Sequence, residues 1–263
     1  MSQPDLRSLR ALALAAIVAI LMSGCATSQP ASEDADDNDP LEPVNRAVFA
    51  FNDTLDTLVL RPVAKGYDTV APRPVKTGVA NVFDNLSTPI WAANHLLQGE
   101  FAEGGIQLGR FAINSTLGLL GLIDAASDAG LQEKSANFSQ TFGKWGIPTG
   151  PYLMLPFLGP STVRGAVGMF ARYETDIVFN YFDDEASIRD KLIVMGIIDA
   201  RRRLLSLDKT RDEAPDEYIL VREAYLSGER YSVYGAEDTD VELDFEDELE
   251  AWDEEDADEP PDE

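Results

Sequence analysis

Few residues in this chain are suited to making or breaking covalent bonds, because 263 residues include one histidine and one cysteine. Ser115 and His95 could serve as a nucleophile and a base. The chain lacks the Gly-x-Ser-x-Gly turn that exposes such a serine in many hydrolases. His95 also precedes two leucines in an apolar stretch. We therefore expect His95 to be packed or interfacial, and the chain to have no catalytic residue.

Three adjacent carboxylates, Asp183, Asp184 and Glu185, are a candidate cation site. They come just before a predicted helix, where acidic residues also favour the helix dipole, so we interpret them as a loop and a helix start. One cysteine and one histidine cannot build a multi-cysteine or histidine-rich metal centre. No glycine-rich stretch carries the Gly-Lys-Ser/Thr of a phosphate loop. The sequence predicts no metal and no cofactor.

The cysteine, Cys25, stands at the end of a targeting segment. Arg7 and Arg10 precede an apolar run at 11–22, and Ser-Gly-Cys follows. A basic start, a short apolar run and small residues describe a secretory signal peptide, and the run is shorter than the roughly 20 residues of a membrane span. The segment resembles a bacterial lipobox, with Met22 in the position usually held by leucine. We predict a lipoprotein signal peptide at 1–24.

Lipidation of Cys25 would give near-permanent anchoring, because each buried CH₂ contributes about 0.8 kcal/mol. The alternative is a free cysteine beside an ordinary cleavage site. Ala26 follows Cys25, and lipoproteins retained in the inner membrane usually have aspartate there. The resemblance to lipoproteins therefore indicates the outer membrane, with the protein anchored on its periplasmic side.

Charge divides the rest of the chain into three parts. The net charge is −26, from 21 basic and 47 acidic residues. Residues 235–263 contain 17 acids and no base, and residues 31–42 contain six acids and no base. We expect a lipidated cysteine with a disordered acidic tether at 25–42, a folded domain at 43–234 and a disordered acidic tail at 235–263. The tail could instead dock on a basic partner surface. Binding to nucleic acid is excluded by this charge.

The middle of the chain shows helical periodicity throughout. Apolar residues recur at helical spacing from Val44 to Leu58, and further helices are expected from Pro74, from a Thr88 cap to Gly99, and over 101–116. Others are expected after a Ser161 cap, over 186–207 as the longest, and over 215–227 with Gly228 as the stop. No stretch sustains two-residue alternation. The sequence predicts an all-α domain.

Glycines are concentrated in one region, with 13 of 19 between Gly99 and Gly168. Several fall where helices are expected, including Gly118 and Gly121, and small residues on helices permit close backbone approach. A second set punctuates the proline-rich stretch 144–160, which cannot form a regular helix. Its apolar run at 152–158 must be buried, or must touch lipid beside protein.

Several separated segments, in order, resemble the MlaA/VacJ family of outer-membrane lipoproteins. The resemblance runs from about residue 39 to 231. The segments are Asp39-Pro-Leu-Glu-Pro-Val-Asn-Arg46 with Phe49, Phe51 and Asn52; Leu60-Arg-Pro-Val-Ala64; Asn81 to Pro89; Leu96-Leu-Gln-Gly99; Arg110-Phe111; Asn114-Ser-Thr-Leu-Gly118; Thr149-Gly-Pro-Tyr152; Leu155-Pro156; Leu158-Gly-Pro-Ser-Thr162; and Val221-Arg-Glu-Ala-Tyr225. Asn137, Gly165 and Glu217 depart from the family pattern.

This resemblance implies a single ring-like domain of amphipathic helices embedded in one membrane leaflet, with a Gly/Pro-rich loop. It implies a central channel through which phospholipids misplaced in the outer leaflet move toward the periplasm, which maintains lipid asymmetry. A trimeric porin and a periplasmic lipid carrier are the implied partners. The motif positions that become candidates for the lipid path are Asn45, Arg46, Phe51, Arg61, Arg110, Asn114, Gly150, Tyr152, Pro156 and Arg164.

Basic residues are the candidates for contacts with lipid phosphate, because cationic donors bind phosphate strongly. They are Arg61, Arg73, Lys76, Arg110 and Arg164. For any single one of them we favour the alternative, a surface charge or a helix partner. Two other classes stay open: a structural envelope lipoprotein, and a lipid hydrolase.

Overall fold

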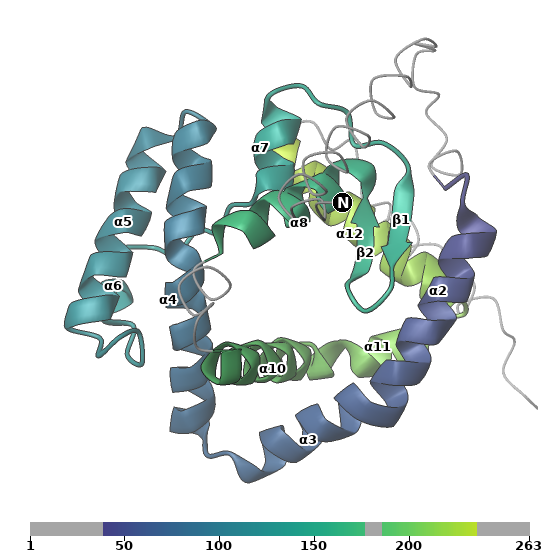
Figure 1. The fold of residues 1–263 in the computed structure, drawn as a ribbon, viewed down its shortest axis with the longest axis horizontal. Coiled ribbons are helices and arrows are strands. Elements are labelled where there is room, and N and C mark those ends of the chain that lie inside the picture. Colours follow the sequence, from purple (N-terminus) through teal and green to yellow (C-terminus); the bar gives the residue numbers. More distant parts are fainter. Residues whose placement is uncertain (1–38, 177–185, 236–263) are drawn as a thin grey trace, which may run out of the picture. The chain divides into compact units, whose positions relative to one another are not determined.

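We describe a computed structural model of the chain over residues 39–176 and 186–235, which fall within one compact unit. Figure 1 shows this part of the chain in colour. The expected signal peptide, Cys25, most of the tether, the acidic tail and the carboxylates Asp183, Asp184 and Glu185 lie outside the described residues. Their assignments remain predictions.

The described residues are mostly helical, as predicted, with two short strands. In chain order the elements are α2 (Glu42–Leu55), a π-helical turn (Asp56–Leu60), α3 (Arg61–Val70), α4 (Arg73–Leu97), α5 (Phe101–Thr116), α6 (Ala125–Asp128), α7 (Phe138–Lys144), β1 (Tyr152–Leu155), β2 (Gly159–Thr162), α8 (Val163–Thr175), α10 (Ala186–Arg203), a 3₁₀ turn (Leu205–Leu207), α11 (Asp208–Asp212) and α12 (Glu217–Tyr234).

The expected helix start at Thr88 is wrong, because α4 runs without a break through Pro89 and, at 25 residues, is longer than α10. Proline cannot donate a backbone hydrogen bond, which normally weakens a helix interior. Here the Thr88 hydroxyl turns back and donates to the Asp84 carbonyl at 2.9 Å. Thr88 therefore supports the turn before the proline instead of capping a new helix.

Two other helix ends differ from expectation. Thr162, not Ser161, caps α8, since its hydroxyl accepts from the Gly165 amide at 3.0 Å while Ser161 lies in β2. α12 continues past Gly228 and ends at Gly235, whose φ of 79° suits a helix C-terminus. A glycine inside a helix costs about 1 kcal/mol, and packing of α12 outweighs that cost.

The proline-rich stretch forms a β-hairpin that the periodicity analysis did not predict. β1 and β2 are antiparallel, with Tyr152 opposite Thr162 and Leu155 opposite Gly159. Phe157 and Gly159 have positive φ values of 64° and 82° in the connecting turn. Alternation over four residues is too short to stand out in a sequence that is also rich in glycine and proline.

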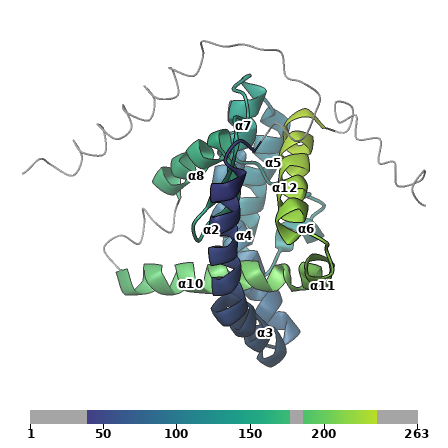
Figure 2. The same cartoon turned by 90° about the vertical axis from the view of Figure 1, so that its right-hand side faces the viewer.

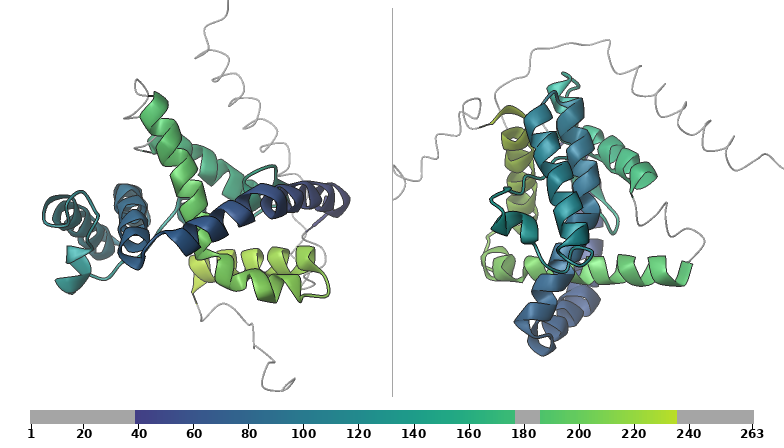
Figure 3. Two further views of the ribbon diagram at one scale, coloured as in Figure 1. Left: turned by 90° about the horizontal axis from the view of Figure 1, so that it is seen from below. Right: turned by 90° about the vertical axis from the view of Figure 1, so that its left-hand side faces the viewer.

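The elements of this unit contact one another in a closed circuit. β1 packs on α2, which continues through the π-helical turn into α3. α3 contacts α10, α10 contacts α4, α4 contacts α7, α7 contacts α12, and α12 returns to β2. Figure 1 shows these elements around an opening, and Figure 2 shows α10 running crosswise to α12. α5 packs along α4 on the side away from the hairpin (Figure 3).

The distribution of side chains is unusual for a helical domain. A small apolar core consists of Tyr152, Met154, Tyr218 and Leu226. Many large apolar side chains are exposed instead, among them Leu58, Val70, Phe101, Leu120 and Phe157. No helix among the described residues has the length and apolar character needed to cross a membrane.

We expect Gly168→Ala in α8 to destabilise the fold. An added methyl group would lie 2.7 Å from the backbone nitrogen of Ser139, and backbone cannot move aside as a flexible side chain can, so the loss should be about 1–3 kcal/mol. The matched control is Gly105→Ala in α5, which meets nothing within 4 Å and should gain about 0.5–1 kcal/mol. Urea titrations in detergent measure both. Equal stability of the two variants would show that the α7–α8 contact is not tight.

Candidate functional site

Asn45 of α2 binds the edge of strand β1 through its side-chain amide. Its Nδ2 donates to the Tyr152 carbonyl at 3.1 Å, and its Oδ1 accepts from the Met154 amide at 2.9 Å. Its Nδ2 also donates to Asp39 at 2.7 Å. The amide thus replaces a neighbouring strand for one residue pair. Because Asn45 and Tyr152 are buried, this contact fixes the hairpin against α2.

Asn52 repeats this contact two helical turns later. Its Nδ2 donates to the Leu155 carbonyl and its Oδ1 accepts from the Phe157 amide, both at 2.9 Å. Asn45 and Asn52 are seven residues apart, which places them on one face of a helix. We call Asn45 and Asn52 the amide pair. The amide pair sets the position of the hairpin turn along α2.

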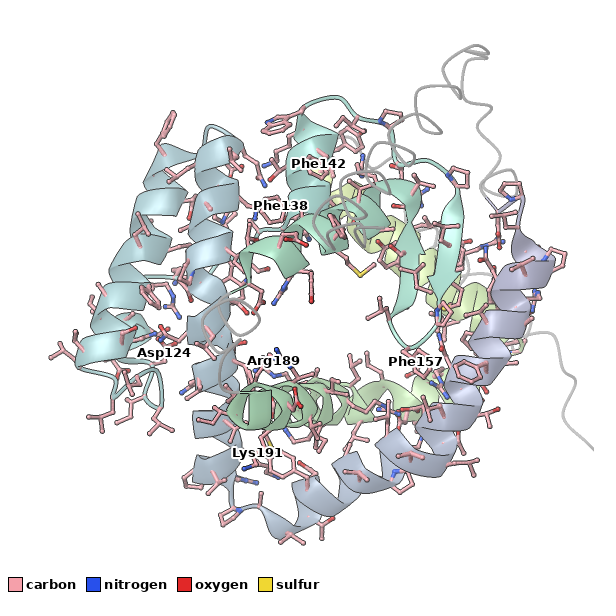
Figure 4. The ribbon with its side chains drawn as sticks, viewed as in Figure 1. Asp124, Phe138, Phe142, Phe157, Arg189 and Lys191 are labelled. Atoms are coloured by element: carbon pink, nitrogen blue, oxygen red, sulfur yellow. The ribbon has the colours of Figure 1, made fainter. Side chains whose placement is uncertain are left out.

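The turn presents apolar side chains. Phe157 and Leu158 are exposed, and Pro156 lies beside them in the same exposed turn. Phe51 contacts Phe157 edge to face, with ring centroids 5.2 Å apart. Figure 4 shows Phe157 at the end of the hairpin, next to α2 and the opening. Both rings are therefore exposed on the surface of the described unit.

A polar network supports the base of α2. The Tyr218 hydroxyl and the Asn45 amide both donate to the Asp39 carboxylate. Burial, together with the hydrogen bond that Tyr218 donates to Asp39, raises the pKa of Tyr218. Arg46 pairs with Asp216 at 2.8 Å, and its guanidinium lies 4.5 Å from the centre of the Tyr218 ring. Burial raises the pKa of Tyr152 as well. These contacts tie α2 to α12.

Arg164 is a buried cation on α8 that is neutralised inside the protein. Its guanidinium donates to Glu229 of α12 at 3.1 Å and to the Ile147 carbonyl at 2.9 Å. Nearby, Gly150 has a φ of 71°, and an added Cβ would lie 3.0 Å from Val163. Both residues therefore hold the hairpin and α8 in place.

Arg110 and Asn114 of α5 form a second polar cluster under α4. Arg110 is buried and binds Asp124 at 3.1 Å and Glu133 at 3.0 Å, while Asn114 donates to Asp124 at 2.9 Å. Burial acts to raise the pKa of Asp124, but hydrogen bonds from Ser127, Asn114 and Arg110 together lower it. Burial and the nearby Asp84 raise the pKa of Glu133. The enclosed space, about 10 Å³, admits a single water-sized group.

Arg61 belongs to a third cluster, where the π-helical turn meets α10 and α11. It donates to Asp212 at 3.0–3.1 Å and lies 3.5 Å from Asp56. Asp56 also accepts from Arg201 at 2.6 Å. Hydrogen bonding to Arg201 and the charges of Arg201, Arg211 and Arg61 outweigh burial and lower the pKa of Asp56. Of the other two basic candidates, Lys76 donates to Asp68 at 2.7 Å and Arg73 is exposed.

The structure therefore separates the ten motif positions. Five of them come together where α2 meets the hairpin: Asn45, Arg46, Phe51, Tyr152 and Pro156. The other five lie in three separate clusters, one with Arg110 and Asn114, one with Arg61, and one with Arg164 and Gly150. Asn52 and Phe157 were not predicted from the sequence as site residues. The seven-residue spacing of Asn45 and Asn52 was a usable signal, whereas nothing in the sequence marked Phe157.

A further apolar surface follows one face of α10. A groove of about 440 Å³ is lined by Asp190, Lys191, Val194, Met195 and Ile198. Figure 4 shows Arg189 on the side of α10 toward the opening and Lys191 on the opposite side, toward α3. The helix itself was predicted over 186–207, but no candidate site residue was placed on it.

The histidine and serine considered for catalysis have other partners. The ring nitrogens of the buried His95 face Glu100 at 2.6 Å and the Lys134 carbonyl at 3.1 Å. The Ser115 hydroxyl accepts from Asn85 at 3.1 Å. Neither nitrogen of His95 is thus paired with Ser115. In the part of the chain that the structure describes, no group of three or more histidine, cysteine and acidic side chains could hold a metal ion.

Comparisons with known proteins agree with the segments described above. A family model described as MlaA lipoprotein matches residues 37–232. The protein called "Intermembrane phospholipid transport system lipoprotein MlaA" in Escherichia coli is 34% identical over 230 residues, which cover 86% of this chain and 90% of that protein. The protein of the same name in Haemophilus influenzae is 32% identical over 225 residues, covering 83% and 88%.

A solved structure described as "Structural basis for maintenance of bacterial outer membrane lipid asymmetry" is similar in fold, with a TM-score of 0.66. It is 36% identical in sequence and covers 74% of this chain and 98% of that chain. The family model spans the described helices, and each of the two matches covers most of the relative's length. The chain belongs to the MlaA lipoprotein family.

Proposed function

We propose that this protein is an outer-membrane lipoprotein that removes misplaced phospholipids from the outer leaflet. In this proposal phospholipids pass between its helices toward the periplasm, in the retrograde direction, and outer-membrane asymmetry is maintained. The observation that carries the proposal is the closed circuit of contacts from α2 through α10, α4 and α12 to the hairpin. A lined passage needs a wall without a gap, and this circuit of contacts supplies one.

The exposed apolar side chains support a position within a membrane leaflet. Val70 is 83% exposed, Leu58 71% and Phe101 72%, and these residues lie on three different helices. Exposing so much apolar surface to water is unfavourable by about 25 cal/mol per Å². Amphipathic helices that lie in the interface bury such residues among lipid chains without crossing the bilayer.

The passage must accommodate both a polar head and apolar tails. Phe51 and Phe157 supply an apolar wall. Arg189, which pairs with Asp190 at 3.3 Å, lies on the side of α10 toward the opening. Arg61, Arg110 and Arg164 are likewise paired with carboxylates. In this proposal the lipid moves along its own concentration gradient, and no covalent bond is broken.

The anchor and the partners belong to the same proposal. Lipidation of Cys25 would hold the domain at the membrane, a trimeric porin would stand beside it, and a soluble periplasmic carrier would receive the lipid. The relatives' name, which places them in an intermembrane phospholipid transport system, supports a carrier. The acidic charge of the chain favours partners with basic surfaces.

Deletion of the gene tests the proposal against its alternatives. We expect phospholipid to accumulate in the outer leaflet and the envelope to leak to detergent. A lipid hydrolase would instead change the amount of lyso-lipid, and an envelope scaffold would change adhesion of the envelope without either effect. Normal asymmetry in the deletion strain would contradict the proposal.

We expect Cys25→Ala to abolish both lipidation and complementation of the deletion, because the domain then loses its anchor. Acyl labelling and the phospholipid content of the outer leaflet measure the two effects. Cys25→Ser is a second variant that removes the thiol with little change in size. A fully active variant without acyl groups would show that the anchor is dispensable.

We expect Asn52→Ala to impair lipid transport while the protein stays folded. The change frees the Leu155 carbonyl and the Phe157 amide near the exposed turn, where water can replace the lost bonds, so stability should fall by about 0.5–1.5 kcal/mol. Asn45→Ala removes the same contact in a buried place and should cost about 1–3 kcal/mol. Outer-leaflet phospholipid and urea unfolding are the measurements.

Thr54→Ala is the matched control for the amide pair, since the Thr54 hydroxyl binds only its own helix at the Ala50 carbonyl. It should complement the deletion fully. If Asn52→Ala also complemented fully, the position of the hairpin turn would have no role in transport.

A further inference from the structure

The segment Leu117–Ile123, between α5 and α6, has a strained backbone. Three successive residues have positive φ: Leu119 at 53°, Leu120 at 61° and Gly121 at 92°. Glycine adopts this conformation readily, but leucine rarely does, because its Cβ approaches the carbonyl oxygen. Strain of this kind persists only where the surrounding structure imposes it, and it is concentrated at functional sites. We call Leu117–Ile123 the leucine loop.

The strain turns apolar side chains outward. Leu117 is 74% exposed and Leu120 77%, and Leu119, Leu122 and Ile123 are each more than half exposed. The other two residues of the loop are glycines, so it has no charged or polar side chain. An apolar segment of this length facing water would be unfavourable.

The backbone of the leucine loop is largely satisfied from within. The amides of Gly118, Leu120, Gly121 and Ile123 donate to the carbonyls of Ile113, Ser115, Asn114 and Gly118 at 2.8–3.2 Å. The Leu122 carbonyl accepts from the Asn81 side chain at 3.2 Å. Irregular backbone is tolerated at the depth of the acyl chains only when its polar groups have partners in the protein.

Polar side chains beneath the loop hold it rigidly. Gly121 lies so close to Asn85 that an added Cβ would be 2.7 Å from the Asn85 side chain. Asn114 bonds to Asp124 and to the Ala126 amide, at 2.9 Å each. Asp124 is in turn paired with the buried Arg110. The charge nearest the loop, that of Asp124, therefore has a partner within the protein.

The outer face of α5 continues the apolar surface of the loop. Its exposed residues are Phe101, Ala102, Gly105, Leu108, Ala112 and Thr116, none of which is charged. Figure 3 shows α5 at the edge of the unit, with α4 on its inner side. An interface with another protein usually includes several hydrogen bonds, and this face offers few donors or acceptors.

We propose that the leucine loop inserts among the acyl chains of the bilayer, with the outer face of α5 lying alongside it in lipid. The inference rests on the proposed function in one respect, that the protein works at a membrane. The loop has no lysine or arginine, so its insertion depends on apolar burial and not on anionic headgroups. Raised salt should therefore leave insertion unchanged.

A fluorescent probe at Leu120 tests this directly. We would introduce Leu120→Cys into a full-length chain carrying Cys25→Ser, label it with nitrobenzoxadiazole and reconstitute it from detergent into phosphatidylcholine vesicles. We expect blue-shifted emission that is quenched by lipids with spin labels on the acyl chains and protected from aqueous iodide. The matched control, Glu213→Cys beside α11, should show the reverse pattern.

Two outcomes would overturn the inference. Iodide quenching at position 120 in the vesicles would place the loop in water. Protection that appeared only after a trimeric porin was added would identify a protein wall as the occupant. If either occurred while Leu120→Cys in a chain that keeps Cys25 still restored outer-membrane asymmetry in cells, the proposed function would stand and only this inference would fail.

A second variant separates insertion from folding. Asparagine tolerates positive φ far better than leucine, so Leu119→Asn with Leu120→Asn should leave the urea midpoint in detergent unchanged or higher. Partition of the same variant into phosphatidylcholine vesicles should fall by about tenfold or more. Leu207→Asn, at an exposed leucine beside the charged α11, should change partition by less than about twofold. Equal partition of the double variant and the wild type would refute insertion.

Discussion

Ion pairs between helices that are distant in the sequence hold this structure together. Arg201 of α10 binds Asp56 in the π-helical turn, Arg203 binds Asp84 of α4, and Arg164 of α8 binds Glu229 of α12. The first two pairs close joints of the contact circuit, and the third ties α8, which packs on α7, to α12. Removing one partner of a buried pair is costly, because it leaves an uncompensated charge. The circuit is therefore specified by charge at its joints and only partly by an apolar core.

This arrangement explains why so many large apolar residues are available on the outside. A domain that relied on its core would need Leu58, Val70 and Phe101 inside, and all three are exposed. In a bilayer, exposing the same side chains to acyl chains is favourable. The internal ion pairs are also screened less by salt than ion pairs on an exposed surface would be. It also explains why a basic motif residue such as Arg110 stabilises the fold. Its charge is neutralised by the internal carboxylates of Asp124 and Glu133.

Part of this could be predicted from the sequence. The periodicity gave α5 its observed bounds, Phe101–Thr116, and gave the mainly helical class, because apolar spacing depends on local geometry. Pro89 was a poor guide to a helix boundary, because α4 continues through it and the Thr88 hydroxyl donates to the Asp84 carbonyl in the preceding turn. Gly118 and Gly121, expected within helices, lie beyond the end of α5 in a turn. Pairs such as Arg201 with Asp56 join residues far apart in the chain, and no local pattern reports them.

The two exposed apolar turns of the described structure share one physical design. Phe157 in the hairpin, and Leu119 and Leu120 in the leucine loop, are the non-glycine residues with positive φ among those described. Asn52 satisfies the Phe157 amide, and Asn81 satisfies the Leu122 carbonyl. In each turn a side-chain amide on a neighbouring helix replaces water as the partner of irregular backbone. The backbone of such a turn needs no water, so an apolar side chain can project from it into lipid. A loop that depended on water for its hydrogen bonds could not lie within lipid.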